Sequence, residues 1–154
     1  MRDVVTVDID AAPATVAVLF ADPRNNPKWM EELEGYEPLS GAPGMAGSTY
    51  RLAQQGGKLV FHVTVVASDL PHEVRLSLDA ASVTVSVRVS FSERGGGGGT
   101  RLVSEEEFKF KSLLGRLFGF LSKRAIRRAH AGQMASFKRF AEREAASGPA
   151  RGPG

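Results

Sequence analysis

The chain has 154 residues, enough for one domain with one substantial core and too few for two domains of ordinary size. Hydrophobic residues make up 42% and charged residues 24%, which is usual for a folded protein and excludes wholesale disorder. The net charge of +3 is small for a nucleic-acid-binding protein, so we expect no nucleic-acid partner. The chain has no cysteine, which excludes disulfides, thiolate catalysis and cysteine metal sites.

Alternating apolar residues predict an antiparallel sheet in the first two thirds of the chain. The first strand covers residues 4–10, with three apolar side chains on one face. Two short helices follow over residues 12–20 and 25–30, and Asp22 ends the first because a residue before proline avoids helical angles. Six further strands are expected between glycine and proline turns, at residues 35–39, 48–54, 58–67, 72–79, 82–91 and 100–111.

A long helix is predicted over residues 112–146, and Gly115 and Gly119 permit a bend near its start. Its apolar stripe contains two polar positions, which indicates a ligand chamber between helix and sheet more than a solid core. The stripe consists of Ile126, Ala129, His130, Gln133, Met134, Phe137, Phe140 and Ala141. Strands followed by one long helix make the fold α+β. We expect a single domain over residues 1–146 and a disordered tail over residues 147–154.

The sequence shows neither a signal-peptide pattern nor an apolar run near the ~20 residues of a membrane span, so we expect a cytoplasmic location. Basic residues cluster in the last helix, mostly away from its apolar stripe. A solvated helix face is the simple explanation, and the alternative is transient contact with a membrane surface or an acidic partner. These residues are Lys123, Arg124, Arg127, Arg128, Lys138, Arg139 and Arg143.

One ionisable residue interrupts the apolar face of the last strand. Alternation places Glu106 on the buried side, whereas its neighbours Glu105 and Glu107 point away. The other residues on the buried side are Leu102, Ser104, Phe108 and Phe110. An ionised carboxylate in an apolar interior costs several kcal/mol unless it is paired, so we expect a partner or a raised pKa.

His130, on the facing helix, is a candidate partner for Glu106. A carboxylate beside an imidazole can do acid–base work near neutral pH, which makes these two the candidate catalytic residues. Two alternatives stay open: contact of Glu106 with a bound ligand, or a purely structural role. A wet cavity, an Arg neighbour such as Arg75 or Arg88, or a bulge that flips the strand register would make the role structural.

Other inward side chains are candidates for ligand contact. Trp29, the only tryptophan, is a core anchor or a pocket wall, and Tyr50 is a core residue or offers its hydroxyl to a ligand. Gly132 lies in mid-helix, where glycine costs about 1 kcal/mol of stability against alanine. This glycine indicates close packing or room for a guest, or it is simply tolerated. The remaining candidates are Phe61, Val85, Val87, Ser104, Phe108, Gln133, Met134 and Phe137.

Several kinds of site are not expected. The three histidines, His62, His72 and His130, lie on different predicted elements, so we expect no metal. No Ser-His-Asp spacing or nucleophile elbow occurs. The five glycines at residues 95–99 are not followed by Lys-Ser or Lys-Thr, which argues against a phosphate loop. We expect no cofactor.

Segments over nearly the whole chain resemble the SRPBCC superfamily, the START and Bet v 1-like group, and most closely its bacterial polyketide cyclase/dehydrase-type branch. The segments are residues 5–16, 22–29, 47–50, 99–102, 113–119 and 127–142. The resemblance implies a helix-grip fold, in which a curved seven-stranded antiparallel sheet wraps around a long C-terminal helix and encloses a hydrophobic pocket. Members bind lipids, sterols, polyketides or plant hormones, and a minority cyclise polyketide chains. The branch is expected to have apolar residues where this chain has Glu106 and His130, so it assigns neither a role.

We therefore expect a protein that binds or transports a hydrophobic small molecule, lipid- or polyketide-like, with Tyr50, Glu106, His130 and Gln133 orienting it. One alternative is an aromatase/cyclase-type enzyme in which Glu106 and His130 move protons. The other is a membrane-surface or protein-interaction module that acts through residues 113–128.

Overall fold

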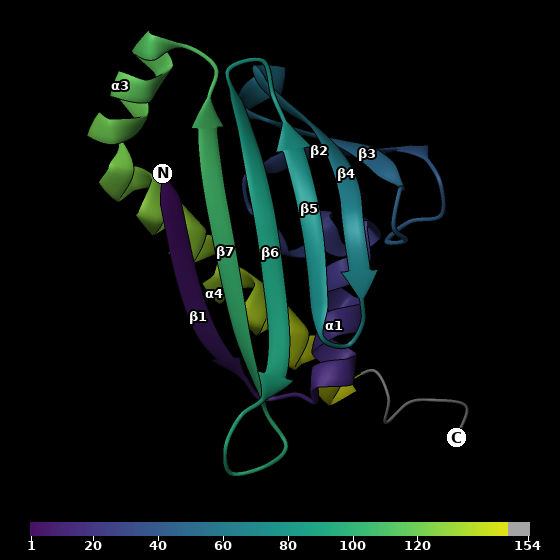
Figure 1. The fold of residues 1–154 in the computed structure, drawn as a ribbon. Helices are drawn as coiled ribbons and strands as arrows, with labels where there is room; N and C mark the ends of the chain where they lie inside the picture. The colour runs from purple at the N-terminus through teal and green to yellow at the C-terminus, as the bar shows by residue number, and fades with distance from the viewer. Residues whose placement is uncertain (148–154) are drawn as a thin grey trace.

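Seven antiparallel strands form one curved sheet, in the order β1-β7-β6-β5-β4-β3-β2 (Figure 1). This computed structural model describes residues 1–147. The strands are β1 (Arg2–Ile9), β2 (Leu33–Ser40), β3 (Thr49–Gln54), β4 (Leu59–Asp69), β5 (Glu73–Asp79), β6 (Val83–Glu93) and β7 (Thr100–Phe110). The predicted antiparallel sheet is confirmed. The first strand, β1, forms one edge of this sheet by pairing with the last strand, β7.

The helices of residues 13–29 and 123–147 lie on one face of this sheet, and the helix of residues 113–121 lies at its end, beside β7 (Figure 1). Between β1 and β2 the chain forms α1 (Pro13–Ala21), the 3₁₀ turn η1 (Pro23–Asn25) and α2 (Asn26–Trp29), and a second 3₁₀ turn, η2 (Gln55–Gly57), follows β3. After β7 come α3 (Leu113–Leu121) and α4 (Lys123–Ser147). No helix among residues 1–147 is long and apolar enough to cross a membrane.

The segment predicted as one long helix is two helices, and the break is at Ser122. Gly115 and Gly119 lie inside α3, against Phe110 at the end of β7, so they serve packing and not the bend. α3 follows the end of β7, whereas α4 runs back along the inner face of the sheet, and the two directions require the interruption. α4 includes Ser147, and the rest of the predicted tail lies outside the described residues.

The main core lies between the sheet and α1, α2 and α4. The Phe137 ring is fully buried, and its centroid lies 5.2 Å from those of both Phe20 and Trp29, in edge-to-face geometry. Such pairs add to the free energy gained by burial. A smaller cluster under β3 and β4 contains Tyr50 and Leu52. The core is therefore largely aromatic where α4 crosses the two short helices.

Polar contacts fix α4 along the edge strand. Lys138 Nζ donates to the carbonyl of Asp8 at 2.5 Å, and Glu142 Oε2 accepts from the backbone N–H of Asp10 at 2.8 Å. Nearer the start of α4, His130 makes a third contact, with Asp3. The helix is thus held on one side by hydrogen bonds to β1 and on the other by aromatic packing.

The buried stripe of α4 differs from the predicted one at two positions. Ala129 is exposed, and Ser136 is buried instead, with its hydroxyl donating to the carbonyl of Trp29 at 2.6 Å. A Cβ at Gly132 would meet no atom within 4 Å, so this glycine neither packs closely nor is required by its surroundings. The buried stripe of α4 includes polar residues because they bond to groups on other elements: His130 to a carboxylate and Ser136 to a backbone carbonyl.

We predict that Gly132→Ala stabilises the protein by about 1 kcal/mol, because alanine lowers the entropic cost of the helix and meets open space. The measurement is the free energy of unfolding in urea. Gly119→Ala is the matched control, and it should not show this gain, since its Cβ would collide with the ring of Phe110. Equal gains from both variants would contradict this account of α3 packing.

Candidate functional site

A partly open cavity lies between the inner face of the sheet and α4. The centre of a water molecule can reach about 60 Å³ of it. Its apolar walls come from α1, α2, the sheet and α4: Phe20, Ala21, Trp29, Met30, Leu52, Val74, Leu76, Leu78, Val87 and Met134. Polar side chains are few: Asn26, Tyr50, Ser104, Glu106 and Gln133.

Seven of the predicted site residues line this cavity, namely Trp29, Tyr50, Val87, Ser104, Glu106, Gln133 and Met134. The others do not line it. Phe137 and Val85 are buried in the core, and Phe61 packs against both clusters. Phe108 stacks on Phe110 and lines a groove beside α3 instead. Phe20, Met30 and the leucines of β5 are wall residues that the sequence did not single out.

Two aromatic wall residues carry polar atoms that matter for a ligand. Burial raises the pKa of Tyr50 well above its ordinary value, so its phenol stays protonated and able to donate. Trp29 Nε1 is buried and has no hydrogen-bond partner within residues 1–147. An unpaired buried donor is costly, which makes the indole N–H available to a guest molecule.

His130 is fully buried and bonded at both ring nitrogens. Nδ1 lies 2.9 Å from Asp3 Oδ2, and Nε2 lies 2.8 Å from Ser104 Oγ. Because an ionised carboxylate only accepts, Nδ1 carries a proton and donates to Asp3. In the neutral ring Nε2 then accepts from the Ser104 hydroxyl. Hydrogen bonds through the imidazole of His130 therefore connect Ser104, on the cavity wall, to the carboxylate of Asp3.

Glu106 lies beside this chain of hydrogen bonds. Its Oε1 is 3.4 Å from His130 Nδ1, and it is paired across the strands with Asp3. Burial raises the pKa of Glu106; His130 opposes the rise and the nearby carboxylate of Asp3 adds to it. Arg127 Nε approaches the other oxygen of Asp3 at 3.6 Å from a half-exposed position. Two carboxylates and an imidazole thus share one largely buried site.

Sequence reasoning missed Asp3 and therefore the Asp-His-Ser order of the contacts. The signal was present, because alternation along β1 places Asp3 on the same face as Val5, Val7 and Ile9, as it placed Glu106 on the face of β7. A Ser-His-Asp arrangement is thus absent from the linear sequence and is formed only in the folded chain.

Ser104 is not placed as a hydrolase nucleophile. It lies in mid-strand and its backbone pairs with Val5 on β1 and Val89 on β6, so the strand ladder uses the N–H groups that an oxyanion hole would need. The arrangement is suited to holding and moving a proton at Ser104 Oγ, on the cavity wall.

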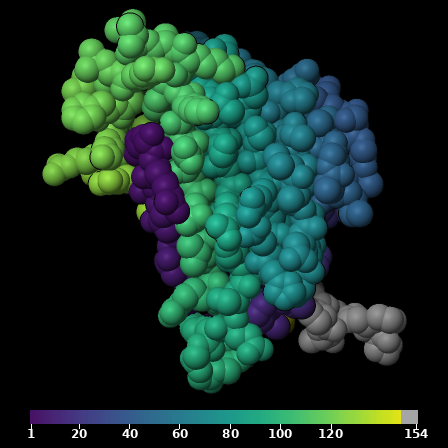
Figure 2. Space-filling view, in the orientation of Figure 1, coloured from purple at the N-terminus to yellow at the C-terminus, as the bar shows by residue number. Residues whose placement is uncertain are grey.

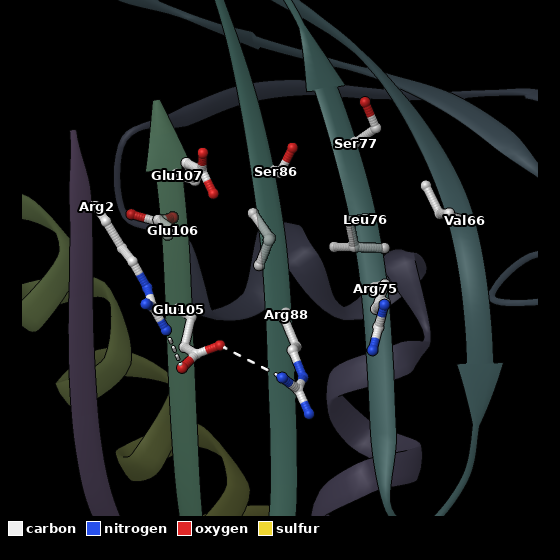
Figure 3. A pocket seen from close by; sticks show the side chains of 11 residues that line it. Arg2, Val66, Arg75, Leu76, Ser77, Ser86, Arg88, Glu105, Glu106 and Glu107 are labelled. Carbon is white, nitrogen blue, oxygen red and sulfur yellow. Dashed lines mark hydrogen bonds and ion pairs between the residues drawn. The ribbon is translucent and has the colours of Figure 1, made fainter. Parts of the chain in front are cut away.

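The opposite face of the sheet is charged (Figure 3). Arg88 approaches Glu105 at 3.9 Å and Glu73 at 2.5 Å, and Arg75 also pairs with Glu73, at 2.8 Å. Neither arginine pairs with Glu106, so an arginine partner, one form of the structural alternative, is absent among the described residues. A depression of about 350 Å³ lies over these side chains. Its open, charged lining does not suit an apolar ligand.

Residues 3–142 match the model of the family described as Polyketide cyclase / dehydrase and lipid transport. The chain belongs to this family. The match begins at Asp3 and ends at Glu142, so it includes every residue of the cavity and of the buried polar cluster. Among curated proteins, none matches the chain.

Solved structures of this type confirm the helix-grip fold. TTHA0849 from Thermus thermophilus has a TM-score of 0.75 at 17% identity, over 97% of this chain and 99% of that one. A START superfamily protein from Mycobacterium smegmatis has 0.69 at 18%, over 94% and 97%. The di-domain ARO/CYC BexL from the BE-7585A biosynthetic pathway has 0.72 at 18%, over 97% of this chain and 51% of BexL. At these identities the likeness concerns the fold alone.

Glu106→Gln should change how stability depends on pH. Because the pKa of Glu106 is raised from 4.5 in the folded chain, folding favours the protonated carboxyl. Its contribution to stability is complete below the unfolded-state pKa and is lost as the pH rises toward the folded-state pKa. Glutamine mimics the protonated form, so the variant should lack this loss and gain stability over the wild type toward neutral pH. Urea unfolding across acid to neutral pH measures both curves.

Glu107→Gln is the matched control, since Glu107 is exposed on the outer side of the same strand. It should follow the wild-type curve. A Glu106→Gln curve parallel to that of the wild type would show that burial does not raise this pKa.

Proposed function

We propose that this family member binds a hydrophobic small molecule, lipid- or polyketide-like, in the cavity between the sheet and α4. The observation that carries the proposal is the composition of the cavity wall, which is apolar with a few polar groups held in fixed positions. Ligand pockets have this character, because apolar walls supply affinity and isolated polar groups supply orientation. Tyr50, Glu106, Gln133 and the indole N–H of Trp29 are the orienting groups.

The cavity must expand to accept such a ligand. Its 60 Å³ holds a few water molecules, whereas pockets for drug-sized ligands are about 300–1,000 Å³. Met30 and Met134 are wall residues with flexible, unbranched side chains that rearrange easily. Met30 follows directly after α2, a helix of only four residues, so a shift of this short segment would enlarge the pocket.

Val87→Phe should reduce affinity at least tenfold, because the larger side chain enters the space that the ligand needs (about 1.4 kcal/mol per tenfold change). The first step is a thermal-shift and native mass spectrometry panel of fatty acids, sterols and aromatic polyketides with the wild type. The best ligand is then titrated against the variant.

Val85→Phe is the matched control, since Val85 faces inward on the same strand but does not line the cavity. It should cost stability through overpacking and leave the affinity of the folded protein within a few-fold of wild type. No retained ligand and no shift across the whole panel, or equal loss in both variants, would refute binding in this cavity.

A second candidate is an aromatase/cyclase-type enzyme, and the Asp3–His130–Ser104 chain favours it. With His130 protonated, Nε2 donates to Ser104 Oγ, and the serine hydroxyl can donate to a ligand carbonyl. With His130 neutral, Ser104 can accept from a ligand enol and pass the proton inward. Such a relay gives or removes the oxygen-bound proton when a poly-carbonyl chain enolises before ring closure, and the carboxylate of Glu106, on the same cavity wall, is the base for the carbon-bound proton.

Ser104→Ala should lower turnover of a poly-β-ketone substrate about 10²–10⁴-fold, the usual contribution of a general acid or base, while substrate affinity stays within a few-fold. Product analysis and direct binding measure the two effects. Ser90→Ala, on β6 and on the opposite face of the sheet, is the control. Unchanged products with Ser104→Ala and His130→Ala would exclude this enzyme and leave the binding protein.

A further inference from the structure

Helix α3 carries its large apolar side chains on the outside and its glycines on the inside. Gly115 and Gly119 face Phe110, and the outward side chains are 55–81% exposed. These are Leu113, Leu114, Leu117, Phe118, Phe120 and Leu121. A helix that packs to build its own core has the opposite arrangement, and contiguous exposed apolar side chains mark an interaction surface. Figure 2 shows α3, in light green, as an uncovered ridge at one end of the molecule.

The sequence that contains this ridge carries cations and no carboxylates. No Asp or Glu occurs between Glu107 and Glu142, a stretch with nine Lys and Arg residues. Of the seven within residues 109–128, Lys111 and Arg127 have carboxylate partners, at 2.8 and 3.6 Å. The other five have no carboxylate within 4.0 Å in residues 1–147: Lys109, Arg116, Lys123, Arg124 and Arg128.

A groove runs between α3 and the end of β7. Its volume is about 420 Å³, and its aromatic walls are Phe108, Phe110 and Phe120. Four cationic side chains border it: Arg2, Lys109, Arg116 and Lys123. Arg2 pairs with Glu105 at 2.8 Å, whereas the other three have no carboxylate partner in residues 1–147. Apolar surface and unpaired cations therefore occur together at the same end of the molecule.

We propose that α3 docks this protein on the surface of a lipid bilayer that contains anionic headgroups. The exposed leucines and phenylalanines enter the boundary between headgroups and acyl chains, and the cations contact phosphate groups. A helix of nine residues is far too short to span a bilayer and lies in its plane. This docking is independent of what the internal cavity binds.

The observations favour lipid over a second copy of the chain or another protein. In a two-fold dimer through α3, each unpaired cation cluster would face its own copy, and like charges would repel. The outward side chains of α3 include only Arg116 as a hydrogen-bonding group, whereas protein interfaces carry about one hydrogen bond per 100–200 Å². A bilayer requires apolar area and charge but no directional contacts.

The test is sedimentation of the full chain with vesicles. Phosphatidylcholine vesicles containing a minority of phosphatidylglycerol should carry the protein down, and pure phosphatidylcholine vesicles should carry much less. Binding should weaken as salt rises, because salt screens the headgroup charge. Failure to sediment with the anionic vesicles would overturn the proposal and leave ligand binding in the cavity unaffected.

Two pairs of substitutions separate the apolar from the electrostatic part. Leu114→Ser with Phe118→Ser should weaken binding to anionic vesicles at least about tenfold, since two side chains no longer enter the bilayer. Val18→Ser with Met45→Ser removes exposed apolar side chains elsewhere (58% and 62% exposed) and should have no effect. Thermal unfolding checks that both variants fold.

Lys123→Gln with Arg124→Gln should weaken the same binding roughly 25-fold, at about fivefold per cation near the surface. The charge-matched control is Lys28→Gln with Lys58→Gln, two cations without a carboxylate partner in the described chain and far from α3 in sequence. Equal losses in the test and control variants would show that binding depends on net charge and not on the cations beside α3, which would contradict docking through α3. Concentration-dependent dimers without vesicles, abolished by Leu114→Ser with Phe118→Ser, would identify a second copy as the occupant of α3 instead.

Discussion

The position of α4 against β1 determines the core, the cavity and the buried polar cluster together. Three contacts between polar groups hold the helix along this edge strand. The pairs are His130–Asp3, Lys138–Asp8 and Glu142–Asp10. They follow both elements in the same direction, so a slip of α4 by one turn would break all three at once. With the helix held at the edge, its other side faces the short helices, where Phe137 closes the core and Gln133 and Met134 border the open space.

The same arrangement explains why ionisable groups are tolerated inside. Burying Asp3, Glu106 and His130 singly would be costly, because each would lose its hydration without a partner. Together they offset part of this cost, because His130 bonds Asp3 at 2.9 Å and lies 3.4 Å from Glu106, and Arg127 reaches Asp3 from the solvent side. The uncompensated desolvation cost falls on Glu106, because burial raises the pKa of this carboxyl. The group with the least compensation is thus the one that borders the cavity.

Local patterns were sufficient to predict most of the fold. Alternation located the strands, and the residue before Pro23 ended the first helix, because both depend on neighbours in the sequence. The same alternation identified Glu106 as a buried carboxylate. The helix-grip arrangement came from family resemblance, since pairing of β1 with the last strand joins residues about a hundred positions apart and leaves no local trace.

Contacts between distant elements were the part that could not be predicted. Asp3 and His130 are 127 residues apart, and nothing in either segment specifies the other. The break at Ser122 depends on the different directions of α3 and α4. The burial of Ser136 in place of Ala129 depends on the rotation of α4 about its axis. A helical period fixes which residues share a face, but only tertiary packing fixes where that face is aimed.

The smallness of the cavity has a consequence for any ligand. A molecule larger than a few waters binds only the fraction of the protein in which the wall has already moved, so its measured dissociation constant equals the intrinsic one divided by that fraction. Affinity then depends as much on the mobility of Met30 and the short helix before it as on contacts with the guest. Relatives with the same wall residues but a stiffer α2–β2 connection would bind the same molecule more weakly.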